Sequence, residues 1–213
     1  MPDISLTDFI KFVSATGSSR ITKVRDAKCR GVYDPRSDYW KQMREAIVAF
    51  HAPTNTTDKV PYFRTFMDGI TNASKLQSFK LVSDNYKRFL GKKSITGLPV
   101  QKTRWTHNGL TVRVNPESLL NINGSRELYK LYFAEAALSK QKSNAILALM
   151  SVALPNISNV DQFAVYDGRN NRIIRSATPD PNLMMLVRGE ADAFVSIWNE
   201  IECPPPAATN DDF

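Results

Sequence analysis

The sequence predicts an α+β protein with an N-terminal helical layer and a C-terminal antiparallel sheet covered by helices. Through residues 1–94, hydrophobic residues recur every three or four positions, which is typical of amphipathic helices. After Pro99 the spacing changes to alternation, which is typical of strands. Asn108-Gly109 and Asn123-Gly124 indicate tight hairpin turns, because both residue types tolerate positive φ.

Four helices are predicted in the first region. Ser5 is a suitable N-cap for the first of them, Pro35 fits the first helical position of the second, and Gly91 closes the last. The predicted helices cover about residues 6–13, 35–52, 62–70 and 76–89. The predicted organisation is a basic helical region at 1–94, an α+β domain with an antiparallel meander at 95–202, and a disordered acidic tail at 203–213.

Two hairpins open the second region and predict a meander of three or four antiparallel strands. Their strands cover residues 101–106 and 110–114, then 119–122 and 127–133. The last of these strands has a helical alternative, because Ser125 could cap a helix and Leu128, Leu131 and Tyr132 keep helical spacing. The remaining predicted elements are a buried helix at 139–154, a strand pair at 162–167 and 172–177, and a final helix at 181–201.

Positive charge is concentrated in the first half of the chain. Residues 1–100 contain 17 Lys and Arg against 9 Asp and Glu, a net +8, whereas residues 101–213 contain 11 against 12. No apolar run approaches the roughly 20 residues of a membrane span, and Asp3, Asp8 and Lys11 interrupt the only candidate signal segment. These features predict a soluble cytoplasmic protein with no membrane partner. Cys29 and Cys203 lie far apart in the sequence, and we expect both to be reduced thiols.

The densest group of cations, five within eleven residues, lies between the first two predicted helices. A basic segment at this place could follow a phosphate backbone. The alternative is a solvated surface segment, in which Ile21, Val24 and Ala27 hold one edge of a short helical turn on the core. The predicted nucleic-acid contacts of this group are Arg20, Lys23, Arg25, Lys28 and Arg30.

A second basic group lies on and after the fourth predicted helix. Part of its charge has a structural explanation, because Lys80, Asp84 and Arg88 are spaced for an intrahelical ladder. Cations near the last turn also favour the helix dipole. The predicted nucleic-acid contacts of this group are Lys87, Lys92 and Lys93.

Carboxylates and a lysine near the predicted strand ends suggest a second function. A metal-dependent nuclease holds Mg²⁺ with acidic residues from neighbouring strands and keeps a lysine near the attacking water. The spacing here does not match the usual Glu-x-Lys pattern, Glu127 could instead pair with Arg113, and Asp167 before Gly168 fits a turn. The candidate catalytic residues are Glu127, Lys130, Glu135 and Asp167.

We therefore predict a nucleic-acid-associated protein, with DNA or RNA as the partner and no cofactor. An open sheet face carrying Lys130, Tyr132 and Arg113 could add stacking and charge to such an interface. The alternatives are a metal-dependent hydrolase, for which Mg²⁺ would be the cofactor, and a protein-interaction module that docks an acidic partner. Phosphate-binding glycine loops and His-rich metal spacings are absent from the sequence.

Overall fold

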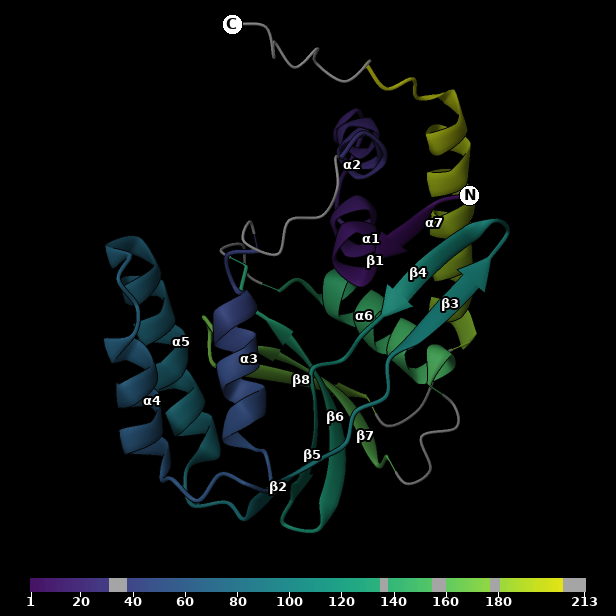
Figure 1. Cartoon of the computed structure of the whole chain (residues 1–213). Coiled ribbons are helices and arrows are strands. Elements are labelled where there is room, and N and C mark those ends of the chain that lie inside the picture. Colours follow the sequence, from purple (N-terminus) through teal and green to yellow (C-terminus); the bar gives the residue numbers. More distant parts are fainter. Residues whose placement is uncertain (31–37, 135–137, 155–159, 177–180, 205–213) are drawn as a thin grey trace, which may run out of the picture.

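The computed structural model describes residues 1–30, 38–134, 138–154, 160–176 and 181–204 (Figure 1). Its helices are α1 (Leu6–Val13), α2 (Ser19–Lys28), α3 (Lys41–Phe50), α4 (Lys59–Asp68), α5 (Ala73–Leu90), α6 (Lys140–Ala153) and α7 (Pro181–Glu200). Its strands are β1 (Asp3–Ser5), β2 (Ile95–Leu98), β3 (Thr103–His107), β4 (Leu110–Val114), β5 (Ser118–Ile122), β6 (Ser125–Tyr132), β7 (Gln162–Asp167) and β8 (Arg172–Ser176).

The strands form two sheets, and the predicted α+β class is confirmed. The larger sheet has the order β2-β5-β6-β7-β8, and all of its pairs are antiparallel except β6 with β7. That pair is parallel because α6 carries the chain back across the sheet between the two strands. The smaller sheet has the order β1-β4-β3, with β1 parallel to β4.

The two predicted hairpins are both present, but the expectation that they form one continuous meander is wrong. Residues Asn108 and Asn123 adopt positive φ at the two turns, as the Asn-Gly pairs predicted. The hairpins belong to different sheets, because β4 pairs with β1, whereas β5 and β6 pair with β2 and β7. Pro116 lies in the connection from β4 to β5 and has no N–H with which to continue a ladder.

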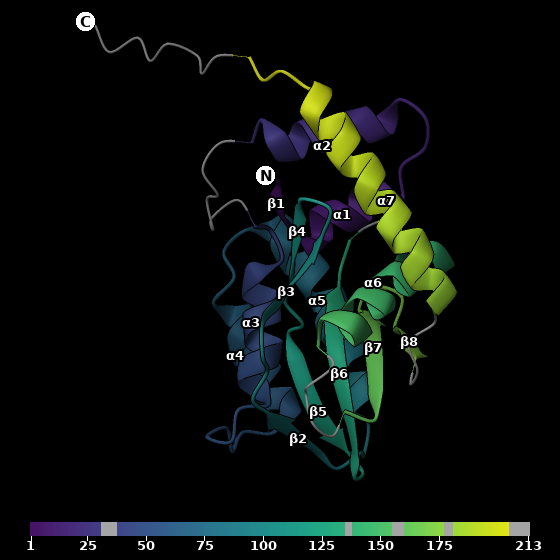
Figure 2. The ribbon, with the colours of Figure 1, turned by 90° about the vertical axis from the view of Figure 1, so that its right-hand side faces the viewer.

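The five-stranded sheet is covered on both faces, as Figures 1 and 2 show. Helices α3, α4 and α5 lie on one face, where Tyr129 and Leu131 of β6 are buried. Helices α1, α6 and α7 and the smaller sheet lie on the other side, where Leu128 is buried. The prediction of an open sheet face is therefore wrong, since successive β6 residues point into two different hydrophobic clusters.

Helices α1, α6 and α7 match their predicted ranges within one residue, whereas α4 and α5 each begin three residues earlier than predicted and α3 begins only at Lys41. Helix α2 was not among the four helices predicted for the first region. Ser5 and Ser139 cap α1 and α6 through their side chains, and Gly91 ends α5 with φ of 50°. The predicted start at Asp34 and Pro35 lies outside the described residues. Ser125 begins strand β6, so the helical alternative for this stretch is wrong, since β5 and β7 pair with its two edges.

A disulfide joins Cys29 to Cys203, with the two Cα atoms 5.3 Å apart. The prediction of two reduced thiols is therefore wrong. The two residues are 174 positions apart in the sequence, and packing of α2 beside the end of α7 brings them together. No local spacing pattern could have revealed this pair.

Candidate functional site

The first basic group forms helix α2, which packs against α1 and α7. Val24 is fully buried and anchors the helix in the core. Arg20 forms an ion pair with Glu190 of α7, and its guanidinium lies 4.2 Å from the centre of the Phe12 ring of α1. The group is a docked helix, as the alternative interpretation expected. Val24 is buried and Ala27 half-buried, but Ile21, the third residue of the expected contact, is 42% exposed.

Lys28 caps the C-terminal end of α7. Its Nζ donates hydrogen bonds to the carbonyl oxygens of Trp198 at 2.6 Å and Ile201 at 2.7 Å. The last carbonyls of a helix lack partners within the helix, and a cation there also complements the helix dipole. The positive charge of Lys28 is thus used within the protein.

Arg30 makes a bidentate contact with Asp8 of α1. Its two terminal nitrogens donate to the two carboxylate oxygens at 3.1 and 2.8 Å, and Ser5 also donates to this carboxylate. Burial by itself would raise the pKa of Asp8, but the hydrogen bonds from Arg30 and Ser5 outweigh it and lower that pKa. The contact with Asp8 also raises the pKa of Arg30. This pair fastens the end of α2 to α1.

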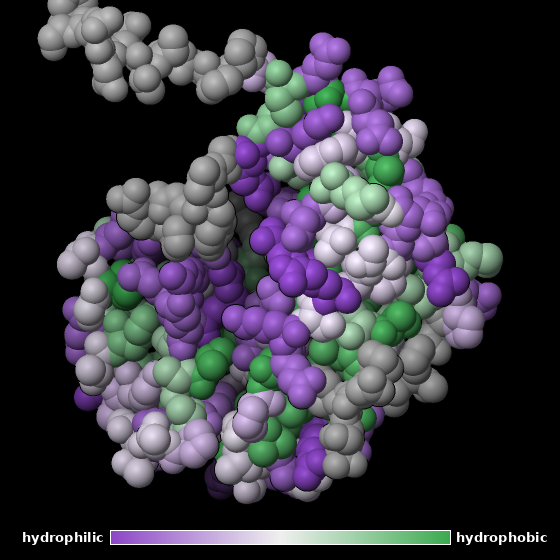
Figure 3. Space-filling view, turned by 45° about the vertical axis from the view of Figure 1, so that its right-hand side comes forward, coloured by the Kyte–Doolittle hydropathy of each residue, from purple (hydrophilic) through white to green (hydrophobic). Residues whose placement is uncertain are grey.

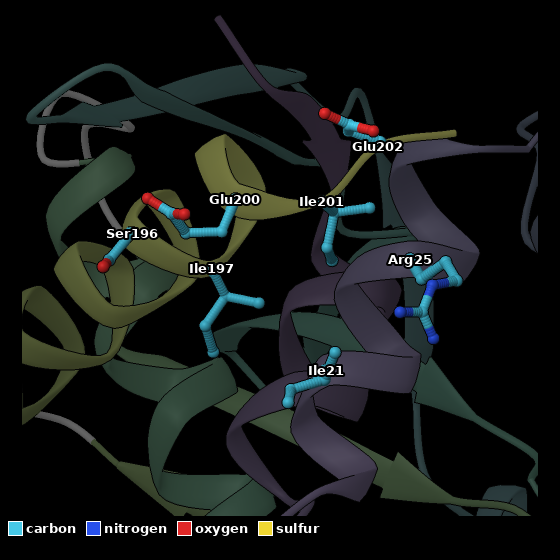
Figure 4. Close-up of a pocket in the computed structure, with 7 residues that line it drawn as sticks. All are labelled: Ile21, Arg25, Ser196, Ile197, Glu200, Ile201 and Glu202. Atoms are coloured by element: carbon cyan, nitrogen blue, oxygen red, sulfur yellow. The ribbon is translucent and has the colours of Figure 1, made fainter. Parts of the chain in front are cut away.

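Lys23 and Arg25 of α2 make fewer contacts within the protein than the other cations of this group. Lys23 lies 3.7 Å from Asp26 in an exposed pair of little strength. Arg25 is exposed, and no other described residue forms a hydrogen bond or ion pair with its side chain. It lines a shallow pocket between α2 and the end of α7, which Glu200 and Glu202 also line, but neither carboxylate is turned toward Arg25 (Figure 4).

The second basic group surrounds the C-terminal end of α5. Lys87 forms an intrahelical ion pair with Asp84 at 2.8 Å. The expected ladder of Lys80, Asp84 and Arg88 is not among the ion pairs of the described residues, and Arg88 donates to Asn85 instead. Lys93 donates to the carbonyl oxygen of Phe89 and lies 4.3 Å from the centre of its ring. Lys92 is exposed and has no hydrogen-bond or ion-pair partner in the part of the chain that the structure describes.

Two further cations from other parts of the chain join this end of α5. Lys59, at the start of α4, donates to the carbonyl oxygen of Gly91. Arg175 of β8 lies near Lys93. Burial is the larger cause that lowers the pKa of Lys93, and the positive charge of Arg175 lowers it further. We call Lys59, Lys92, Lys93 and Arg175 the basic end.

The two basic groups lie at opposite ends of the molecule. Helix α2 is at the top of both Figure 1 and Figure 2, whereas the connection from α5 to β2 is at the bottom of both. A rigid ligand that contacts the basic end would therefore leave α2 free. The eight predicted nucleic-acid contacts do not form a single surface.

Glu127 and Lys130, proposed from the sequence as catalytic partners, lie on opposite faces of β6. Their separation of three residues places them on different sides of a strand. Glu127 is 6% exposed and accepts hydrogen bonds from the Tyr129 hydroxyl and from Arg175 Nε at 2.8 Å. Burial and the contact with Glu127 raise the pKa of Tyr129. Glu127 is therefore part of a structural network with Arg175, and not a partner of Arg113.

Lys130 forms an ion pair with Glu117, and this pair was not predicted from the sequence. Its Nζ also donates to the carbonyl oxygen of Asn115 at 3.1 Å. The two-residue turn at Asn123-Gly124 fixes a register in which position 117 lies opposite 130, so counting from the turn would have found this pair. Arg113 belongs to the smaller sheet, where it lies 3.4 Å from Asp3, so it does not share a sheet with Lys130.

Asp167 stabilises the turn after β7, which is the alternative that the sequence offered for this residue. Its buried carboxylate accepts hydrogen bonds from the backbone and side chain of Asn170 and from the N–H of Leu138. Glu135 lies outside the described residues. Among residues that the structure describes, no three His, Cys, Asp or Glu side chains are grouped so that they could hold a metal ion.

A buried histidine lies where α3, α5 and β2 meet. His51 Nε2 is 2.6 Å from the hydroxyl oxygen of Tyr86, and burial lowers the pKa of His51 to about 4. The backbone of His51 packs so closely on Gly97 of β2 that a side chain at position 97 would overlap it. We assign this junction a structural role.

Comparisons with known proteins do not identify the chain. No family model matches it, and no curated protein matches it. A solved structure, the crystal structure of a protein named SSO0001, aligns with a TM-score of 0.40 and 11% identity over 93% of this chain and 78% of that one. A likeness this weak carries no functional argument. Among the described helices, none has both the length and the apolar character that crossing a membrane requires.

Proposed function

We propose that this protein associates with nucleic acid through the basic end. The observation that carries the proposal is the convergence of Lys59, Lys92, Lys93 and Arg175 around the end of α5. Arg175 is bonded to the buried carboxylate of Glu127, whereas Lys59, Lys92 and Lys93 form no ion pair among the described residues. A localised positive field of this kind attracts phosphate backbones and steers their approach.

Lys92 is the central contact in this proposal. It is exposed and lacks a hydrogen-bond or ion-pair partner among the described residues, so binding a phosphate would break no contact within the protein. Lys59 and Lys93 each donate to a backbone carbonyl oxygen, and a lysine ammonium has three donors. Both can therefore keep their present contact and still offer hydrogen bonds to a phosphate oxygen.

The other two hypotheses from the sequence receive less support. A hydrolase would require Glu127, Lys130 and Asp167 to act together, yet each is occupied by a different structural contact. A protein-interaction module would more often present a hydrophobic patch. On the face in Figure 3, hydrophobic side chains occur singly or in small groups among hydrophilic ones.

Salt-dependent binding tests the proposal. We would measure the affinity of the full chain for single-stranded and double-stranded oligonucleotides at several salt concentrations. Replacing Lys92 and Lys93 by Glu should weaken binding to both and reduce the slope of log K against log salt by about 1.4 to 1.8, since each of the two phosphate contacts contributes roughly 0.7 to 0.9. A matched variant, Lys11→Glu with Lys140→Glu, makes the same change in charge at exposed sites on α1 and α6. Equal losses in the two variants would refute the assignment to the basic end.

We also propose a cytoplasmic location, as the sequence suggested. Disulfides in that compartment are usually transient or redox-sensing. The Cys29–Cys203 bond would then exchange with cellular thiols, which cell fractionation followed by thiol labelling of the native protein would detect. Recovery of the protein only from an oxidising compartment would contradict this location.

A further inference from the structure

One buried amide fastens the turn between β7 and β8 to α5. The side chain of Asn85 is 4% exposed and donates hydrogen bonds to the carbonyl oxygens of Gly168 at 2.9 Å and Arg169 at 3.0 Å. Its amide oxygen accepts a hydrogen bond from Arg88 at 3.2 Å. Since hydrogen bonds of a buried amide are costly to break, Asn85 holds Arg88 beside the turn that carries Arg169.

Arg88 and Arg169 are cations without a carboxylate partner. Arg88 is exposed and Arg169 is half-buried, and neither forms an ion pair within the described part of the chain. The neighbouring carboxylate on α5, Asp84, is paired with Lys87. The carboxylate of Asp167, at the start of the turn, is fully buried. Both guanidinium groups therefore keep N–H donors that a ligand can use.

These two arginines continue the basic end along one edge of the larger sheet. Strand β8 forms this edge, and Arg175 lies on its α5 side, because it contacts the hydroxyl of Tyr129. Between Asn85 and Leu90, α5 rises about 7.5 Å, and the basic end lies just beyond. A strand of a duplex has a phosphate about every 3.4 Å of its axis, so this distance corresponds to about three phosphates. We call Arg88, Arg169 and the basic end together the basic row.

The helix and the strand of this row offer no aromatic ring on which a base could stack. The three aromatic side chains of α5, Phe79, Tyr86 and Phe89, are at most 5% exposed. Strand β8 contains no aromatic residue. The ammonium of Lys93 also lies 4.3 Å from the centre of the Phe89 ring. Because proteins that bind single strands gain affinity from base stacking, the composition of the row favours contact with the phosphate backbone alone.

We propose that the basic row binds double-stranded nucleic acid through the phosphates of one strand and does not read its bases. This inference rests on the proposed function and adds to it a class of ligand and two contacts, Arg88 and Arg169. A duplex carries one negative charge for about every 1.7 Å of its axis, so it attracts a row of cations more strongly than a single strand does. Its phosphates also have a fixed spacing, which suits cations held in place by Asn85 and, for Arg175, by Glu127.

Matched removal of charge tests the two added contacts. Arg88→Gln with Arg169→Gln removes two charges and keeps the backbone carbonyl oxygens that Asn85 holds, so the variant should fold, which its urea midpoint checks. For a short duplex of mixed sequence, the slope of log K against log salt should fall by about 1.8, and the affinity at low salt by about ten- to a hundredfold. Lys11→Gln with Lys140→Gln removes the same charge at exposed sites on α1 and α6 and should change both much less. Equal losses in the two variants would overturn the assignment of Arg88 and Arg169.

Comparison of ligands tests the class of nucleic acid. The duplex should bind about three- to tenfold more tightly at low salt than a single strand of the same length, and duplexes of different sequence should agree within about threefold. Tighter binding of the single strand, or strong dependence on sequence, would overturn the choice of a duplex bound through its backbone. Loss of binding in the Lys92 and Lys93 variant but not in the arginine variant would overturn the basic row and leave the proposed function intact. If the unaltered chain binds neither ligand even at low salt, the proposed function itself is refuted.

Discussion

His51 should make the stability of the fold depend on pH. In the folded protein burial lowers its pKa to about 4, whereas the ordinary value is 6.5. Between these values the unfolded chain binds a proton that the folded protein does not, so the free energy of unfolding falls as the pH falls. With these two pKa values, the free energy of unfolding decreases by about 2.5 kcal/mol between about pH 7.5 and about pH 4.5. Most of this decrease occurs below about pH 6.5.

Urea denaturation at pH values across this window measures the effect. His51→Gln keeps an amide that can bond to the Tyr86 hydroxyl but does not titrate, so its stability should change much less over the same range. His107→Gln is the matched control, because it removes the other histidine of the chain and leaves the buried one. If wild type and His51→Gln lose the same stability between these pH values, the assignment to His51 is refuted.

Three more perturbations test other parts of the structure. Reducing the Cys29–Cys203 bond, which closes a loop of 174 residues, should lower the free energy of unfolding by about 2 to 5 kcal/mol in urea titrations with and without reductant. An unchanged midpoint would show that the bond is not formed in solution. Gly97→Ala should cost about 2 to 4 kcal/mol, because the new Cβ overlaps the backbone of His51, whereas Gly189→Ala, where nothing lies near the new atom, should cost little. Glu127→Gln should cost about 1 to 3 kcal/mol by urea denaturation, since it removes the charge that Arg175 and Tyr129 contact, and a cost equal to that of an exposed substitution such as Glu45→Gln would contradict the network.

Local signals in the sequence predicted most of the secondary structure. Asn108-Gly109 and Asn123-Gly124 mark the two hairpins because the turn requires positive φ, and Ser139 begins α6 because its hydroxyl accepts a helix N–H. The division into two sheets was not predicted. It depends on where β4 and β5 find partners, namely β1 at the N-terminus and β2 before the hairpins.

The contacts of the candidate site residues were harder to predict because their partners are distant in sequence. Arg20 and Lys28 contact residues 170 positions away, and no helical or strand periodicity reports such a contact. The Glu127 and Lys130 grouping failed for a simpler reason, since residues three apart on a strand face opposite ways. Strand parity and hairpin register were sufficient to reject that group and to pair Lys130 with Glu117.

The net charge of residues 1–100 therefore does not show where the surface of the folded protein is positive. Arg20, Lys28 and Arg30 are used to dock α2, so they add less to an external field than their number suggests. Arg175, from the nearly neutral second half, lies at the basic end but is itself paired with the buried carboxylate of Glu127. Long-range steering depends on the charges that remain unpaired at one place on the surface, and here these are the lysines at the start of α4 and after α5.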